Sequence, residues 1–311
     1  MKENATVPSV PLGMKERVRP RKTSIWKQVI RRFIRKKSAL VSLSFLVFIF
    51  LLSFAGPFFS PYMLEGVDTA SINLAPSAEH WLGTDNLGRD VLTRLMLAGR
   101  ISLTVGLGAM CLSVLIGGIL GVVSGYYRGL ADQVIMRTAD VLMTLPGLPL
   151  LFIIAAVMSE WKVPADQRLY YVMIMLSIIG WPGLARLIRS QVLTLREREF
   201  MQATEILGLR DRRKVMNHLL PNIVPLLIVT GTLSVGGAIL SESALSYFGL
   251  GVVPPTPSWG NMITAANSLL DFKNRPWLWI PPGVTIFLTV ISINILGDSL
   301  RDAIDPNHTK G

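Results

Sequence analysis

Charged side chains are scarce in this sequence of 311 residues: aspartate, glutamate, lysine and arginine make up 16% of it, whereas a soluble domain carries about a quarter. A protein with so few charges cannot cover a globular surface in the usual way, but a protein embedded in a bilayer has no such need. Half of the residues are apolar, which excludes intrinsic disorder. Cysteine is nearly absent, because Cys111 stands alone; this excludes a disulfide framework and a cluster of thiolate metal ligands.

Motifs of catalysis and of nucleotide binding are missing as well. The chain has no G-x-x-x-x-G-K-[ST] phosphate loop, no H-E-x-x-H or C-x-x-C metal site and no G-x-S-x-G nucleophile turn. The predicted spans and the distribution of basic residues place His80 across the membrane from His218 and His308, so the three histidines cannot form one metal site. We therefore expect a protein that is not an enzyme, with no cofactor and no metal.

Six uncharged stretches are long enough to cross a bilayer, which takes about 20 apolar residues in a helix. They are residues 39–56, 101–127, 141–159, 169–185, 219–241 and 276–297. A seventh stretch, 243–270, contains three prolines and two asparagines, and backbone interrupted so often cannot lie unsatisfied in lipid. We expect an extramembrane loop there, with partial re-entry into the membrane as the alternative. The sequence thus predicts an all-α polytopic membrane protein with six transmembrane helices.

Basic residues are distributed unevenly among the segments between these spans. The segments 1–38, 126–140, 186–218 and 298–311 hold 24 lysines and arginines, against 7 in the other three, while the acidic residues divide 11 to 9. Because basic residues accumulate on the cytoplasmic side, we expect both termini and the 186–218 segment to be cytoplasmic. The protein would then lie in the inner or plasma membrane.

The N-terminal 38 residues contain 12 of the basic side chains. Over residues 24–36 the apolar side chains form one helical stripe, which is typical of a helix lying in the membrane interface. A secretory signal would have a shorter apolar core, and no nucleic-acid-binding signature accompanies the charge. We therefore interpret residues 1–38 as a cytoplasmic basic tail that binds lipid, and we expect no nucleic-acid partner.

An ion-coupled secondary transporter would also be polytopic and basic inside. Such transporters usually carry ionisable residues within the membrane, whereas Arg137, Asp140, Glu242 and Asp298 lie at the edges of the predicted spans. Proline-containing segments lie at 145–149 and 180–183. They can open a cavity between helices or merely kink them, and the sequence leaves both alternatives open.

The segment 189–222 is the most informative loop, because it is predicted to form two short cytoplasmic helices. Over 197–207 a small, weakly apolar patch recurs at helical spacing: Phe200, Ala203, Thr204 and Leu207. Gly208 would end this helix in a left-handed turn. A second helix would begin at Asp211, whose charge suits the helix dipole, and end before Pro221. This arrangement is typical of a docking surface, and a solvated amphipathic loop is the alternative.

The same loop carries a specific resemblance. Gln202-Ala203-Thr204-x-x-x-Gly208, followed by Leu220-Pro221, resembles the EAA loop of bacterial ABC importer permeases, whose two helices seat in a groove of the ATPase subunit. Gln202 stands where that family usually has glutamate, and Thr204 stands where it has a second alanine. Glutamine keeps hydrogen bonds but not charge, so docking is expected without a salt bridge from this position.

Three further segments, 80–90, 246–261 and 297–306, resemble signatures of the oligopeptide, dipeptide and nickel permease family. In order along the chain, and with the span spacing, they extend the likeness over residues 26–306. The resemblance implies the type I fold of ABC importer permeases. Its parts would be a first transmembrane helix at 39–56, an extracytoplasmic loop at 57–100, a five-helix core at 101–298 that includes the coupling loop 189–222, and a cytoplasmic tail at 299–311.

The resemblance also implies function and partners. The chain would import oligopeptides or dipeptides together with a second homologous permease, two ABC ATPase subunits and an extracytoplasmic substrate-binding protein. Coupling to the ATPase would fall to Gln202, Ala203, Thr204 and Gly208, with Leu220 and Pro221 fixing the second helix. Nickel import by the same family and an ion-coupled transporter remain alternatives, and no residue is assigned to the substrate.

Overall fold

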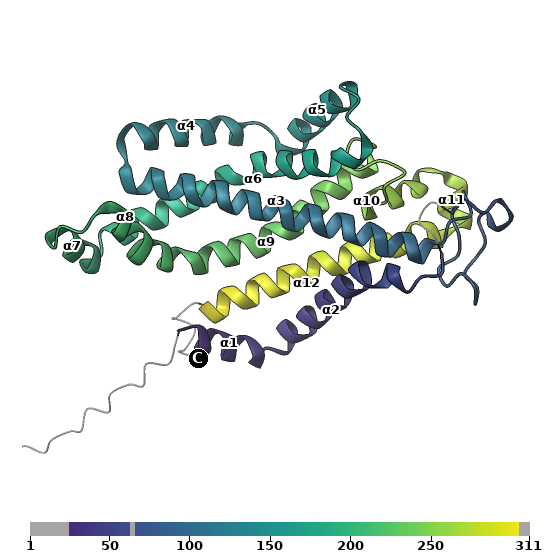
Figure 1. The fold of residues 1–311 in the computed structure, drawn as a ribbon, viewed down its shortest axis with the longest axis horizontal. Helices are drawn as coiled ribbons and strands as arrows, with labels where there is room; N and C mark the ends of the chain where they lie inside the picture. The colour runs from purple at the N-terminus through teal and green to yellow at the C-terminus, as the bar shows by residue number, and fades with distance from the viewer. Residues whose placement is uncertain (1–24, 63–65, 305–311) are drawn as a thin grey trace, which may run out of the picture.

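Five long helices run along the molecule, and the computed structural model describes residues 25–62 and 66–304 (Figure 1). They are α2 (Lys37–Phe54), α3 (Val91–Tyr127), α6 (Ala165–Arg196), α9 (Leu220–Tyr247) and α12 (Ile280–Ile304). The shorter α-helices are α1 (Ile25–Arg35), α4 (Gly129–Thr144), α5 (Gly147–Glu160), α7 (Glu199–Ile206), α8 (Asp211–Lys214), α10 (Trp259–Met262) and α11 (Leu269–Asn274). Single turns of 3₁₀-helix lie at Gly56–Phe58, Thr69–Ser71 and Pro276–Leu278, with a longer one at Ile263–Asn267. The part of the chain that the structure describes contains no β-strand, which confirms the all-α class.

The third predicted span, 141–159, is not one helix. The five long helices are apolar and long enough to cross a membrane, but α4 and α5 meet at a bend of 89° and add a sixth span only if the bent pair crosses as one. Leu145 has extended backbone angles, as expected for a residue before proline. Pro146 then directly precedes the first residue of α5. The proline-containing 145–149 segment therefore bends the chain, which is one of the two alternatives that the sequence left open for it.

Two helix boundaries differ from the expected ones. α3 begins at Val91, ten residues before the predicted span, because the Asp90 carboxylate accepts a hydrogen bond from the Thr93 N–H at 2.7 Å and caps the helix. α6 extends to Arg196 and passes through Pro182 without a break. Both helices therefore contain charged residues. A search for uncharged runs leaves such residues out and makes the predicted spans too short.

The N-terminal helix α1 lies where an interfacial helix was expected, although residues 1–24 fall outside the described chain. It contacts α12 (Figure 1), and Lys36, just after α1, forms an ion pair with Asp302 at 2.5 Å. Val29 is buried, whereas Ile30 and Ile34 are exposed. Exposed apolar side chains on such a helix fit the predicted position against lipid.

The centre of the bundle is α3, which packs most extensively on α6. Gly117, Gly121 and Gly125 form a row along this contact, and a Cβ atom added at Gly121 would lie 2.6 Å from the Ala185 carbonyl oxygen. Small residues at every fourth position let two backbones approach closely. The resulting van der Waals contacts stabilise the helix pair, because lipid supplies no hydrophobic effect between membrane helices. This row therefore fixes the distance between α3 and α6.

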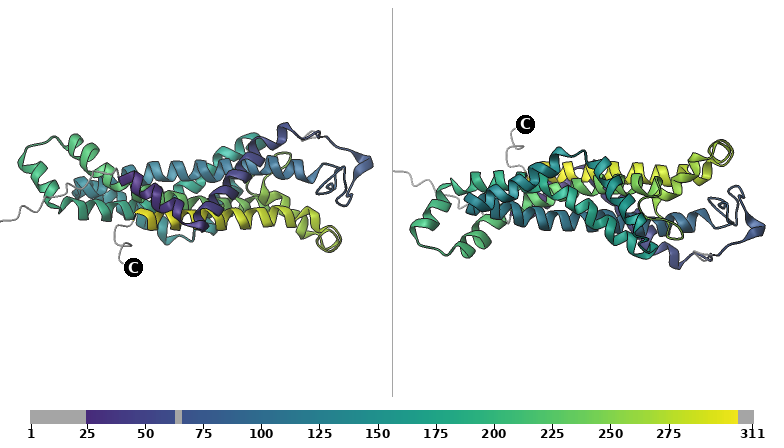
Figure 2. Two further views of the ribbon diagram at one scale, coloured as in Figure 1. Left: turned by 90° about the horizontal axis from the view of Figure 1, so that it is seen from below. Right: turned by 90° about the horizontal axis from the view of Figure 1, so that it is seen from above.

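The bundle has two distinct ends, which also lie apart in the two further views (Figure 2). We call the end that carries α7 and α8 the loop end, and the end that carries α10 and α11 the far end (Figure 1). Most of the predicted 243–270 loop lies at the far end and folds back onto the bundle. Trp259 of α10 is buried, and its indole N–H donates to the Leu95 carbonyl at 3.2 Å.

Candidate functional site

The turn at the end of α7 has the geometry that the sequence predicted. Gly208 has a φ of +63°, and its N–H donates to the Glu205 carbonyl at 3.0 Å, while the Leu209 N–H donates to the Thr204 carbonyl at 3.2 Å. Both bonds satisfy carbonyl groups at the helix end. A Cβ atom at Gly208 would meet no atom within 4 Å. The position therefore favours glycine for its backbone conformation and not for lack of space.

The four side chains of the patch predicted on α7 differ in their solvent exposure. Phe200, Ala203 and Leu207 are exposed, as expected of a docking surface, but Thr204 is only 5% exposed. Its hydroxyl donates to the Met201 carbonyl at 2.6 Å, so it supports the helix from inside. Ile206, which the pattern did not indicate, is 88% exposed.

Ile206 and Leu207 together form the apolar tip of α7. Leu207 is 75% exposed, and the two residues directly precede Gly208 at the C-terminal end of α7. Adjacent exposed apolar side chains on a projecting loop are typical of a surface that another protein covers. The apolar tip is therefore the part of this loop best suited to contact a partner.

The second helix of the loop begins at Asp211, as predicted, but it does not end before Pro221. A π-helical turn, Val215–Leu219, joins α8 to α9 without a gap. Leu220 and Pro221 are the first residues of α9, and Pro221, which has no N–H to donate, directly follows the π-turn, where the regular helical hydrogen-bond pattern is already interrupted. Leu219 is wholly buried, whereas Pro221 is exposed. The second loop helix is thus an extension of the long helix.

Polar contacts join the loop that contains α7 and α8 to the ends of α3 and α6. The Tyr126 hydroxyl donates to Asp211 Oδ1 at 2.7 Å, and the Arg196 guanidinium donates to the Tyr126 carbonyl at 2.6 Å while lying over the tyrosine ring. Met201 of α7 belongs to the same buried cluster as Tyr126 and Leu219. α7 therefore packs into a cluster that contains side chains of α3, α6 and α9.

A charged pair ties α4 to α6 near this end. Asp132 accepts two hydrogen bonds from Arg189, each of 2.6 Å, and Ser124 of α3 donates to the same carboxylate. Bidentate pairs of this kind fix both distance and orientation. The pair holds α4 beside the bundle although the chain bends sharply at its end.

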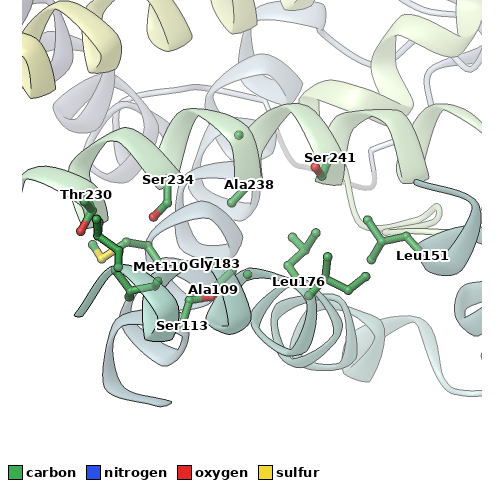
Figure 3. A pocket seen from close by; sticks show the side chains of 15 residues that line it. Ala109, Met110, Ser113, Leu151, Leu176, Gly183, Thr230, Ser234, Ala238 and Ser241 are labelled. Atoms are coloured by element: carbon green, nitrogen blue, oxygen red, sulfur yellow. The ribbon is translucent and has the colours of Figure 1, made fainter. Parts of the chain in front are cut away.

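A cleft of about 450 Å³ lies between α3, α5, α6 and α9. Figure 3 shows Thr230, Ser234 and Ser241 along one helix, with Met110 and Ser113 across the space from its Thr230 end. The remaining lining residues are small or aliphatic: Ala109, Leu151, Leu176, Ile179, Gly180, Gly183, Leu184, Leu187, Gly237 and Ala238. Gly180 and Gly183, at the two ends of the 180–183 segment, line this space, so of the two alternatives for this segment the structure favours a cavity.

A buried carboxylate lies beside the cleft, toward the far end. Glu242, next to the cleft-lining Ser241, has no exposed surface. It accepts hydrogen bonds from Ser246 at 2.6 Å and from Ser102 of α3 at 2.9 Å. The two serine oxygens in turn accept the backbone N–H groups of Val252, at 3.0 Å, and Trp259, at 3.2 Å. By drawing the hydroxyl protons toward itself, Glu242 leaves both serine oxygens free to hold the 249–262 segment.

Comparison with known proteins shows which family has this arrangement. Residues 117–310 match the family described as the binding-protein-dependent transport system inner membrane component. The chain belongs to this family. Residues 24–76 also match the N-terminal transmembrane domain of oligopeptide transport permease C.

Curated relatives of this inner-membrane component align over nearly their whole length. The oligopeptide transport system permease protein OppC of Bacillus subtilis is 37% identical over 298 residues, covering 96% of this chain and 95% of the relative. The dipeptide transport system permease protein DppC of Alkalihalophilus pseudofirmus is 35% identical, with 91% and 90% covered. The glutathione transport system permease protein GsiD of Pectobacterium atrosepticum is 36% identical, with 90% and 91% covered.

Sequence reasoning about this inner-membrane component missed the Glu242 cluster and the cleft. The uncharged runs predict Glu242 at the edge of a span, and its partner Ser102 lies 140 residues away in the sequence. The serines on both sides of Glu242 were a visible signal, because an acid within an apolar run must find donors. No comparable signal marks the cleft, whose lining residues are ordinary in a membrane helix.

Proposed function

We propose that this chain is the membrane-spanning permease subunit of an ATP-driven ABC importer that moves oligopeptides or dipeptides into the cytoplasm. The apolar tip of α7 carries the proposal. It is exposed at one end of the bundle, while Met201 and Asp211 anchor its loop to α3, α6 and α9. A partner bound at the tip can therefore shift those three helices as a unit, which is how a ligand biases a two-state transporter.

The partners follow from this arrangement and from the family. Two ABC ATPase subunits hydrolyse ATP and receive the loop end, a second homologous permease completes the pathway, and an extracytoplasmic binding protein delivers cargo at the far end. The distribution of lysine and arginine supports this orientation, with both termini and the loop end in the cytoplasm. The chain performs no chemistry itself.

The cargo is proposed from the cleft and from the relatives. Hydroxyl, glycine and aliphatic groups line the cleft, which suits main-chain amides of a peptide better than any one side chain. The named relatives transport oligopeptides, dipeptides and glutathione. Nickel import by the same family is the near alternative.

Affinity purification of the tagged chain in mild detergent tests the docking role. We expect the ATPase subunits and a second permease to co-purify, and Ile206→Glu to abolish retention of the ATPase because a charge would enter an apolar contact. Leu269→Glu is the matched control, since Leu269 is 69% exposed at the opposite end. ATPase retention that survives Ile206→Glu would contradict the docking surface.

Uptake into proteoliposomes tests the energy source and the cargo. The purified complex, supplied with its substrate-binding protein, should accumulate labelled trialanine only with ATP inside the compartment that carries the ATPases, and an uncoupler should have no effect. Uptake that stops with an uncoupler alone would indicate an ion-coupled transporter. Uptake of nickel in place of the peptide would support the near alternative.

A further inference from the structure

A second pocket, of about 310 Å³, lies at the far end and shares no lining residue with the cleft. One wall is the 85–94 segment that leads into α3, and the other comes mainly from α10, α11 and the segment between them, with Pro254 and Leu278. Two arginines, Arg89 and Arg94, and two aspartates, Asp85 and Asp271, line it. The neighbouring cleft is uncharged, so this pocket has a different chemistry.

The aspartate nearest to the arginines is already engaged. Oδ1 of Asp85 accepts the N–H groups of Leu87 at 2.9 Å and Arg89 at 3.0 Å. Its Oδ2 accepts the guanidinium of Arg89 at 2.8 Å. Arg94 approaches the same oxygen only at 3.4 Å. One carboxylate therefore serves two arginines, and Arg94 receives the weaker contact.

Arg94 keeps a donor that no other described residue satisfies. Its side chain lines the pocket and is 7% exposed, and its Nη1 is buried without a hydrogen-bond partner within residues 25–62 and 66–304. The second aspartate, Asp271, is paired with Arg275 at 2.5 Å. Within the described residues, Asp85 is shared by Arg89 and Arg94, and Asp271 is paired with Arg275, which does not itself line the pocket, so these five groups carry a surplus of one positive charge. A buried charge without a full set of partners is costly.

We propose that this pocket is a carboxylate-binding site whose principal ligand-binding residue is Arg94, with Arg89 beside it. The surplus of a single positive charge matches a monovalent carboxylate, and the planar guanidinium forks suit its two oxygens. The carboxylate has two sources: the C-terminus of a cargo peptide, or an acidic side chain of a protein that docks at the far end. The binding chemistry follows from the pocket alone, and only the choice of source rests on the proposed import function.

Acetate binding to the purified full chain in lipid nanodiscs tests the chemistry. We expect acetate to raise the melting temperature saturably, and by more than chloride at equal ionic strength. Arg94→Gln should weaken acetate binding at least about tenfold, whereas Arg186→Gln, an exposed arginine in α6, should leave it unchanged. No saturable acetate effect in the natural chain, or an equal effect in Arg94→Gln, would overturn the proposal.

Asp85→Asn gives an independent test with the opposite sign. Asparagine keeps Oδ1 for the two backbone N–H groups but removes the negative charge that competes with the ligand. Acetate should bind more tightly to this variant than to the natural chain. Unchanged or weaker binding would overturn the proposal even if Arg94→Gln failed to fold.

Uptake by the complete transporter identifies the source. In an Arg94→Lys variant, loss of the preference for a free peptide over its C-terminal amide would identify the cargo carboxylate. An equal loss of uptake for both peptides would identify a side chain of a docked protein. Unchanged uptake of both would overturn a role for the site in transport. Failure of the natural complex to transport either peptide would refute the proposed function instead, and acetate binding would still decide the site.

Discussion

Substitution of Gly208 isolates the contribution of one backbone conformation to the docking loop. Because φ is +63° and a side chain would meet no atom within 4 Å, the cost of Gly208→Val comes from the left-handed conformation alone. For an L-residue this cost is about 1–2 kcal/mol, and a β-branched side chain lies at the upper end. The population of the native turn should fall by a factor of about 5 to 30 relative to other conformations of the loop.

The assay is ATP-dependent peptide uptake by the purified complex, measured beside the melting temperature of the chain. We expect uptake to fall in the order glycine, asparagine, alanine, valine, because asparagine tolerates the left-handed region better than alanine does. The melting temperature should stay nearly constant, since the turn is exposed and belongs to no buried cluster. Natural uptake by Gly208→Val, or failure of Gly208→Asn as complete as that of valine, would refute the reasoning.

Three further substitutions test other parts of the structure. Gln202→Glu should preserve uptake and assembly, because Gln202 is exposed and occupies the position that is usually acidic; loss of assembly would mean that the facing groove is acidic or dry. Glu242→Gln should lower unfolding free energy by about 1–3 kcal/mol, because an amide nitrogen cannot accept a serine hydroxyl; denaturant titration should show no such loss in Ser241→Ala, and an equal loss in both variants would count against the cluster. Gly121→Ala should cost about 1–3 kcal/mol, because its Cβ would lie 2.6 Å from a carbonyl oxygen of α6. Gly183→Ala, with nothing within 4 Å, should cost less than about 0.5 kcal/mol, and equal melting temperatures for these two variants would disprove the packing argument.

Hydropathy predicted the long helices because membrane insertion depends on local composition. A run of apolar residues must form a helix in lipid, where no water satisfies the backbone, so α2, α3, α6, α9 and α12 followed from the sequence with errors mainly at their ends. The sharp bend between α4 and α5 did not follow. Pro146 indicates that a helix is interrupted there, but the angle depends on the surfaces against which both pieces pack.

The sequence by itself determined the membrane class, the helical fold, the family resemblance and the turn at Gly208, because each depends on neighbouring residues or on composition. Only the tertiary structure decided that Thr204 faces inward while Ile206 is exposed, since helical periodicity shows which residues share a face but not which face is covered. It alone brought Glu242 to Ser102, 140 residues away, and left Arg94 with a buried donor beside an aspartate already engaged by Arg89. Charge balance in a buried pocket is a property of groups that meet in space, so it appears only when the helices have packed.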